Sequence, residues 1–155
     1  MFKKVLVCLD GSGYAEEILP YIMEEGKAFG KIVLLNVVMT PVINLPVGVP
    51  GESIGPVQTE AMLKRFKEVL EDAPYYLEEK AKALREKGLK VATAIVQGTP
   101  SREIINYARE NGVTLIAIAT HGHSGFREIT MGSTAEYVLK NSGLPVLLFT
   151  PKKGK

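Results

Sequence analysis

Cysteine is almost absent from this chain of 155 residues, and its scarcity excludes several kinds of protein. Cys8 is the single cysteine, so no disulfide can form within the chain, and neither a CxxC redox centre nor a multi-cysteine zinc site is available. Cys8 lies inside a run of apolar residues, where burial raises the pKa of a thiol and suppresses the reactive thiolate. We therefore expect a reducing compartment, with Cys8 acting as a small buried apolar side chain.

Excess charge and long apolar runs are lacking too. Lys and Arg number 19 against 17 Asp and Glu, a formal net charge of +2, which is far from the concentrated basic surface of a nucleic-acid-binding protein. No apolar run approaches the length of a membrane span, and the apolar run near the N-terminus is too short for a signal peptide. These absences predict a cytoplasmic protein with no nucleic-acid partner and no membrane partner.

The chain does contain a regular alternation of strand and helix patterns. Five short apolar runs, most of them rich in β-branched residues, predict buried strands at 5–9, 32–38, 91–96, 115–119 and 145–149. Segments with apolar residues at helical spacing separate them, around 15–23, 63–84, 100–110 and 133–141. Pro20 and Pro74 fall inside two of these segments, and each predicts a kink or a break. The alternation predicts an α/β fold, an open, doubly wound five-stranded parallel sheet with helices on both faces.

The length suits a single domain, which we place at 1–150, followed by a tail at 151–155. One stretch inside it, at about 40–56, fits neither the strand nor the helix pattern. It holds four prolines and three glycines, which cannot propagate a helix or a strand ladder, so it predicts a long loop. Its large apolar residues leave three alternatives open: an interface, a lid or a plain flexible loop.

Two turns that follow predicted strands combine glycine with small polar residues. The first strand is followed by DGSG at 10–13, and the fourth by THGHSG at 120–125. Open parallel sheets bind ligands at the carboxyl ends of their strands, and glycine lets backbone N–H groups approach an anion. These turns therefore predict a ligand site, although Asp10 has the alternative of accepting N–H groups of its own turn.

A third candidate segment is GST at 132–134, which opens the last predicted helix. Ser133 and Glu136 fit a capping box, and the free N–H groups of a helix start favour a phosphate. Neither of the common nucleotide fingerprints, GxxxxGK[ST] and GxGxxG, occurs in the chain. His121 and His123 form an H-x-H pair, but only Glu128 is near enough in sequence to be a third ligand, so we expect no metal site there.

These segments together resemble the universal stress protein family, in its nucleotide-binding branch, over nearly the whole chain. Nucleotide-binding members carry G-x2-G-x9-G-[ST] after the fourth strand, and here Gly122, nine further residues and the Gly132-Ser133 pair match the last part of that pattern. The DGS turn at 10–12 and the VQGTP segment at 96–100 match two more family motifs. Ala119 departs from the pattern, since it stands where the first glycine is expected.

The resemblance implies the strand order 3-2-1-4-5, a homodimer through the last strand, and ATP or AMP as ligand, with Mg²⁺ accompanying ATP. It places the adenine and ribose beside the ends of the first, second and fourth strands, and the phosphates at the glycine-containing segments. The binding residues that it implies are Cys8, Leu9, Asp10, Val37, Ala119, Thr120, Gly122, Gly132, Ser133 and Thr134.

The predicted function is that of a small cytosolic adenine-nucleotide-binding protein that acts in stress response or signalling through nucleotide-dependent conformation or dimer and partner binding. Two alternatives stay open. One is a slow ATPase or phosphoryl-transfer enzyme in the same cleft, with His121 or His123 as acid/base. The other is a nucleotide-free dimeric adaptor, which the departure at Ala119 keeps open. We expect no catalytic residues and at most weak ATP hydrolysis.

Overall fold

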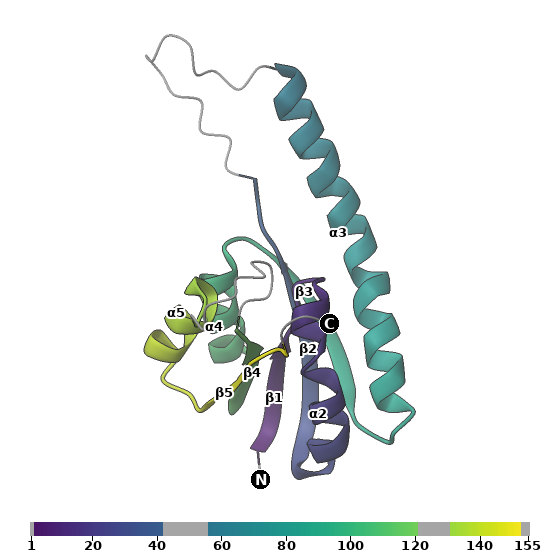
Figure 1. Ribbon diagram of the computed structural model, residues 1–155, viewed down its shortest axis with the longest axis vertical. Helices are drawn as coiled ribbons and strands as arrows, with labels where there is room; N and C mark the ends of the chain where they lie inside the picture. Colours follow the sequence, from purple (N-terminus) through teal and green to yellow (C-terminus); the bar gives the residue numbers. More distant parts are fainter. Residues whose placement is uncertain (1, 42–55, 121–130, 153–155) are drawn as a thin grey trace.

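The computed structural model describes residues 2–41, 56–120 and 131–152. Five parallel strands form one sheet in the order β3-β2-β1-β4-β5, and helices lie on both of its faces (Figure 1). The strands are β1 (Phe2–Cys8), β2 (Phe29–Val38), β3 (Val91–Gln97), β4 (Leu115–Ala119) and β5 (Val146–Phe149). The helices are α1 (Gly13–Glu16), α2 (Leu19–Glu25), the 3-10 turn η1 (Gly26–Ala28), α3 (Pro56–Arg85), α4 (Pro100–Glu110) and α5 (Ser133–Asn141). The predicted fold class and strand order are confirmed.

The central strand β1 shows why this sheet needs helices on both faces. Val5 and Val7 belong to one buried cluster, which also contains residues of α2 and α3. Leu6 and Cys8 belong to a second cluster, which contains residues of α4 and α5. Because successive side chains of a strand point to opposite faces, a strand that is apolar throughout must be covered on both. The sheet is therefore the middle layer of three, and β1 lies at its centre.

The helical segment predicted around Pro20 is divided in two. Helix α1 ends at Glu16, and α2 begins at Leu19 with Pro20 in its first turn. An N–H group in the first turn of a helix has no partner inside the helix, so proline costs nothing there. Helix α4 begins in the same way, with Pro100 in its first turn. The break predicted at Pro20 is confirmed.

Of the kink or break predicted at Pro74, the break is wrong, because α3 runs unbroken for 30 residues with Pro74 inside it. Pro74 itself is exposed, whereas its neighbours on the core-facing side of the helix, Ala73 and Leu77, are buried. In proteins, packing of an apolar face supplies most of the stability of a helix. Here the buried positions begin at Ala73, directly before the proline, and continue at Leu77 after it, so the packed face spans the proline.

The start of α5 also differs from the prediction. Gly132, not Ser133, occupies the N-cap position, and Ser133 is the first helical residue. Glu136 Oε1 accepts a hydrogen bond from Lys140 Nζ at 2.7 Å instead of completing a capping box. Gly132 has a φ of 77°, in the region that residues with a side chain rarely adopt. The predicted capping box is therefore wrong, and the backbone conformation at this position requires glycine.

Two predicted segments lie partly outside the described residues. Of the loop expected at about 40–56, residues 42–55 are not described, and Pro56 already belongs to α3. Of the tail, Pro151 and Lys152 are described, and the backbone N–H of Lys152 donates to Glu17 Oε2 at 2.8 Å. None of the helices in the described ranges has the length and apolar character needed to cross a membrane.

Candidate functional site

A pocket of about 850 Å³ opens at the carboxyl ends of β1, β2 and β4. Strand β1 lies between β2 and β4 in the sheet, so the strand order reverses beside it. This is the place where open α/β sheets bind their ligands. The start of α5 forms another part of the wall, and α3 forms the far side. The pocket thus collects elements that are far apart in the sequence.

Eight of the ten residues implied by the sequence resemblance line this one pocket. They are Cys8, Leu9, Asp10, Val37, Ala119, Gly132, Ser133 and Thr134. Thr120 is not among the lining residues: it is buried, and its backbone N–H donates to the carbonyl of Phe149 at 2.8 Å, which ties the end of β4 to β5. Gly122, like His121 and His123, lies outside the described residues.

Asp10 follows β1 directly and is held by its own turn. Its Oδ1 accepts a hydrogen bond from the backbone N–H of Ser12 at 2.9 Å. Ser12 in turn caps α1, because its Oγ accepts from the N–H of Ala15 at 3.2 Å. Gly11, between the two, has a φ of 86°. The structural role considered for Asp10 is therefore present, and it holds the carboxylate at the wall of the pocket.

Cys8 contributes an uncharged thiol to the pocket wall. It is buried, and this burial, together with the nearby negative charge of Asp10, raises the pKa of its thiol from an ordinary 9.0 to about 12. At neutral pH the group is therefore a protonated thiol, which behaves as a small apolar side chain. This agrees with the expectation from the sequence.

The start of α5 turns hydrogen-bond donors toward the pocket. The N–H of Glu136 donates to the carbonyl of Gly132 at 3.0 Å, so the regular helical bonds begin there. The N–H groups of Ser133, Thr134 and Ala135 precede that bond and have no helical acceptor. Within the described residues no side chain caps this end, and all three residues line the pocket. The helix start thus offers free donors and a partial positive charge to a bound anion.

Helix α3 supplies a wall that sequence reasoning missed. Its pocket-lining apolar residues share one face of the helix; they are Met62, Phe66, Val69, Ala73 and Tyr76. Arg65 and Asp72 line the pocket beside them. The signal was present, since these apolar residues recur at intervals of three and four. By itself this spacing predicts only a face that covers the sheet, because the sequence does not say where the sheet ends.

Tyr76 connects this wall to the turn after β1. Its hydroxyl is buried without a hydrogen-bond partner in the described part of the chain, although Glu16 lies near it. Burial, with smaller contributions from the carboxylates of Glu16 and Asp10, raises the pKa of this phenol. The Nζ atom of Lys80 lies 3.5 Å from Glu16 Oε1 and 5.7 Å from the centre of the Tyr76 ring. These contacts hold α3 against α1 at the edge of the pocket.

A family model and individual known proteins point to the same family for this chain. The model of the universal stress protein family matches residues 1–150. Universal stress protein MJ0577 of Methanocaldococcus jannaschii is 33% identical over 163 residues, which cover 98% of this chain and 97% of that protein. Universal stress protein YxiE of Bacillus subtilis is 34% identical over 154 residues, which cover 96% of this chain and 99% of that protein.

Solved structures resemble the fold over its whole length. The structure of MJ0577 has a TM-score of 0.79 and 30% identity, and covers 99% of both chains. A universal stress protein of Arabidopsis thaliana, solved with AMP bound, has a TM-score of 0.61 and 15% identity, and covers 97% of this chain and 92% of its own. At that identity the second likeness concerns the fold alone.

Proposed function

The chain belongs to the universal stress protein family, and from this membership we propose that it binds an adenine nucleotide, ATP or AMP, in the pocket at the carboxyl ends of β1, β2 and β4. Nucleotide occupancy would then set the conformation of the pocket and the affinity for a second copy or a partner, in stress response or signalling. The Arabidopsis relative solved with AMP supports this proposal. A further solved family member holds cAMP.

The observation that carries the proposal is the start of α5, which no described side chain caps and which lies in the same pocket as Asp10 and Val37. A nucleotide has an apolar base at one end and an anionic phosphate at the other. We assign the phosphate to the free N–H groups at Ser133 and Thr134, because helix starts bind anions. The base and ribose are assigned to the strand ends, where Val37 and Leu9 offer apolar contact and Asp10 a hydrogen-bond acceptor.

Ala119 is compatible with this assignment. It stands where the family pattern has glycine, and it is the last residue of β4, paired with Phe149 in the parallel ladder. Extended strand backbone is open to every residue, so the methyl group imposes no strain there. The departure from the family pattern therefore gives no physical reason to prefer the nucleotide-free adaptor.

Mg²⁺ is proposed to accompany ATP and not AMP. The described residues contain no group of three His, Cys, Asp or Glu side chains that could hold a metal ion. Mg²⁺ commonly keeps several waters and binds through substrate phosphates. We therefore assign its ligands mainly to phosphate oxygens and water, so that removing Mg²⁺ should weaken ATP binding and leave AMP binding unchanged.

A homodimer through β5 is the assembly that we propose. Strand β5 lies at the edge of the sheet, and its four residues are only half-buried. An apolar edge strand presents unpaired backbone groups to any strand that can join it. Sedimentation at micromolar concentration should show a dimer, and a purely monomeric result would remove this part of the proposal.

The experiment that tests nucleotide binding begins with the purified protein. It is denatured, and any released nucleotide is identified by mass spectrometry; the refolded or nucleotide-free protein is then titrated with AMP and ATP by calorimetry. We expect adenine nucleotide in the first measurement or saturable binding in the second. Absence of both up to millimolar concentration would refute the proposal.

A further inference from the structure

The α3 wall of the pocket carries an apolar stripe that the proposed nucleotide site does not use. Met62, Phe66, Val69 and Ala73 follow one another at intervals of four, three and four residues, and all of them line the pocket. This spacing places them on one face of the helix. The stripe continues the face that, farther along α3, is buried against the sheet at Leu77.

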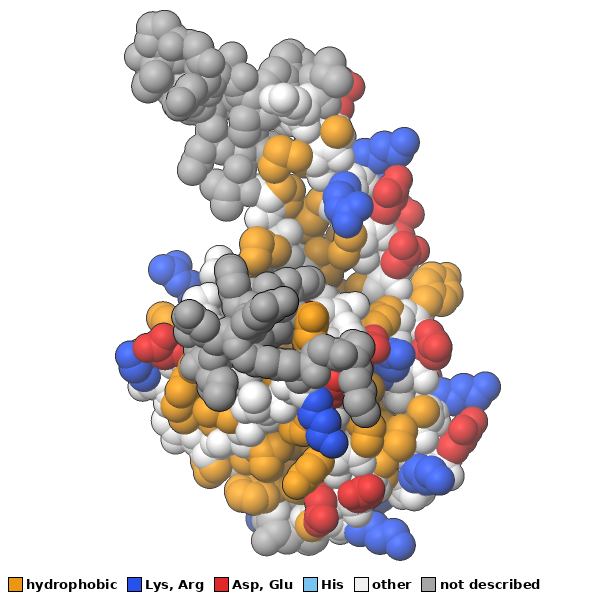
Figure 2. All heavy atoms as spheres, viewed as in Figure 1, with side chains coloured by type: hydrophobic (Ala, Val, Ile, Leu, Met, Phe, Trp, Pro, Cys, Tyr) orange, Lys and Arg blue, Asp and Glu red, His pale blue; other side chains and the backbone are white. Residues whose placement is uncertain are grey.

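The outer part of the stripe is left uncovered by the described residues. Helix α3 extends well beyond the sheet (Figure 1). Val69 and Met62 on this part are 43% and 37% exposed, against 5% at Ala73. Met39, just past the end of β2, lines the same pocket and is 67% exposed. Figure 2 shows hydrophobic side chains gathered over this projecting part of the helix. Methionine adapts its shape readily to apolar ligands.

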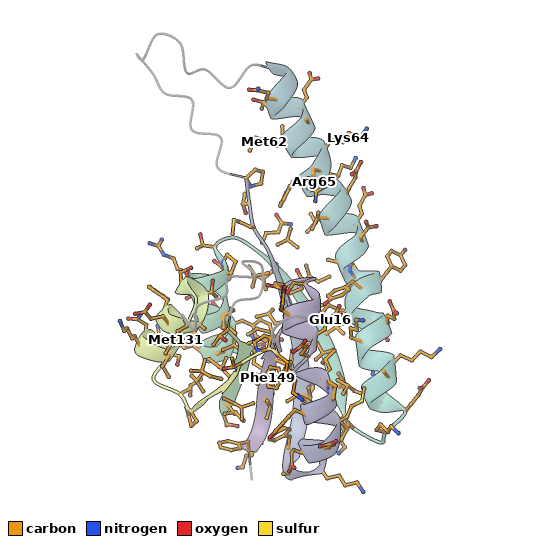
Figure 3. All side chains as sticks on the ribbon, in the orientation of Figure 1. Glu16, Met62, Lys64, Arg65, Met131 and Phe149 are labelled. Atoms are coloured by element: carbon orange, nitrogen blue, oxygen red, sulfur yellow. The ribbon has the colours of Figure 1, made fainter. Side chains whose placement is uncertain are left out.

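A positive charge stands within this apolar surface. Arg65 lines the pocket between Met62 and Phe66, and it forms no salt bridge within the described part of the chain. In Figure 3, Arg65 lies on the pocket side of α3, whereas Lys64 points to the other side. A guanidinium group is weakly hydrated, pairs with carboxylates through two hydrogen bonds and stacks on aromatic rings. It therefore suits an anionic group attached to an apolar body.

We propose that the α3 wall is a second binding compartment, which takes an amphiphilic anion beside the nucleotide. The ligand class is an aryl or acyl group with an anionic end; its apolar part contacts Met62, Phe66 and Met39, and its anionic end pairs with Arg65. The pocket has a volume of about 850 Å³, and the nucleotide is assigned to the strand ends and the start of α5, which leaves the α3 wall for a second ligand. The same chemistry could come from a free acid or from an apolar group attached to the nucleotide.

The test uses two fluorescent probes that differ in charge. Anilinonaphthalene sulfonate is anionic, and N-phenyl-1-naphthylamine is its uncharged counterpart; each is titrated into the full-length folded protein. We expect saturable binding of both. Arg65→Gln should lower the affinity for the anionic probe about 10-fold, as the loss of a charge-assisted hydrogen bond does. The affinity for the neutral probe should stay within about twofold. Phe66→Ala should weaken both probes.

Lys64→Gln is the matched control, because it removes the same charge from the same turn of α3 on the side away from the pocket (Figure 3). It should leave both probes unaffected. Equal losses of affinity for the anionic probe in Arg65→Gln and Lys64→Gln would overturn the proposal, since binding would then depend only on the overall charge of the protein. Probe binding that is accompanied by loss of the near-UV circular dichroism signal would also overturn it, because the probe would be binding partly unfolded protein.

Repeating the titrations with saturating AMP distinguishes the source of the ligand. Simultaneous binding of probe and AMP supports a free acid. If AMP with a benzyl group on its base binds about 10-fold tighter than AMP, and Phe66→Ala removes that gain, the group is attached to the nucleotide. Displacement of the probe by AMP would overturn the second compartment. If AMP itself fails to bind, the proposed function fails, whereas the titrations without AMP still decide this proposal.

Discussion

Replacing Gly132 by alanine tests the proposed site at its most constrained backbone position. Gly132 is the N-cap of α5, with a φ of 77° and a ψ of 143°. A residue with a Cβ atom pays about 1 to 3 kcal/mol to occupy such a conformation, which corresponds to roughly 2 to 12 °C in Tm for a domain of this size. We expect Gly132→Ala to lower stability by this amount.

The same substitution should weaken nucleotide binding. If the backbone relaxes away from a positive φ, the N–H groups of Ser133 and Thr134 turn away from the position assigned to the phosphate. Hydrogen bonds to charged groups contribute about 1.5 to 3 kcal/mol each, so we expect AMP affinity to fall about 10-fold or more. Urea denaturation measures the first effect, and calorimetric titration with AMP measures the second.

Gly143→Ala is the matched control, at the opposite end of the same helix. Gly143 has a φ of 67°, and an added Cβ would meet nothing within 4 Å. This variant should lose about 1 to 2 kcal/mol of stability and keep its AMP affinity. If Gly132→Ala is destabilised but binds AMP normally, the start of α5 is not the phosphate site. Equal loss of affinity in both variants would mean that binding responds only to global stability.

Three further predictions concern stability and the thiol. Ile116→Ala empties a fully buried position of β4 and should cost about 2 to 5 kcal/mol, whereas Tyr75→Ala, at a side chain that is 79% exposed, should stay within about 0.5 kcal/mol by urea denaturation. Arg85→Ala removes hydrogen bonds of 3.1 and 2.9 Å to the carbonyl of Val91 and should lower the free energy of unfolding by about 1 kcal/mol; an unchanged urea midpoint would contradict this. Cys8 should resist iodoacetamide at pH 9 until the protein is denatured, and rapid alkylation of the folded protein would refute the burial argument. Because the pKa of Cys8 is raised from 9.0 to about 12 in the folded state, its contribution to stability should be complete below pH 9 and decline as pH rises toward 12.

The strands were largely predictable, because each has an apolar centre that must be buried. Their ends were less so. Strand β2 was expected from Ile32 but begins at Phe29, which pairs with Phe2 at the start of β1. The intervening Gly30 packs so closely that a Cβ there would lie 2.5 Å from the carbonyl oxygen of Lys3. Pairing between neighbouring strands extends them past their apolar centres, and a single sequence does not record that pairing.

Local residue chemistry was enough to determine the strand-helix alternation, the helix boundary at Pro20 and the protonated state of Cys8, because each depends on a residue and its immediate neighbours. Through the family resemblance, the sequence also indicated eight of the residues that line the candidate site. The choice of Gly132 over Ser133 as the cap of α5 depended on a backbone angle that residue preferences do not specify.

Only the tertiary structure decided which segments share the pocket. Asp10, Val37 and Gly132 come from three separate segments, and the parallel sheet brings them together by aligning the carboxyl ends of its strands. The sequence likewise determined that α3 has an apolar face, because the spacing of its residues is a local property. Whether Met62 and Phe66 on that face lie against the sheet or beside an open pocket depends on where the sheet ends, and that is set by the packing of the whole chain.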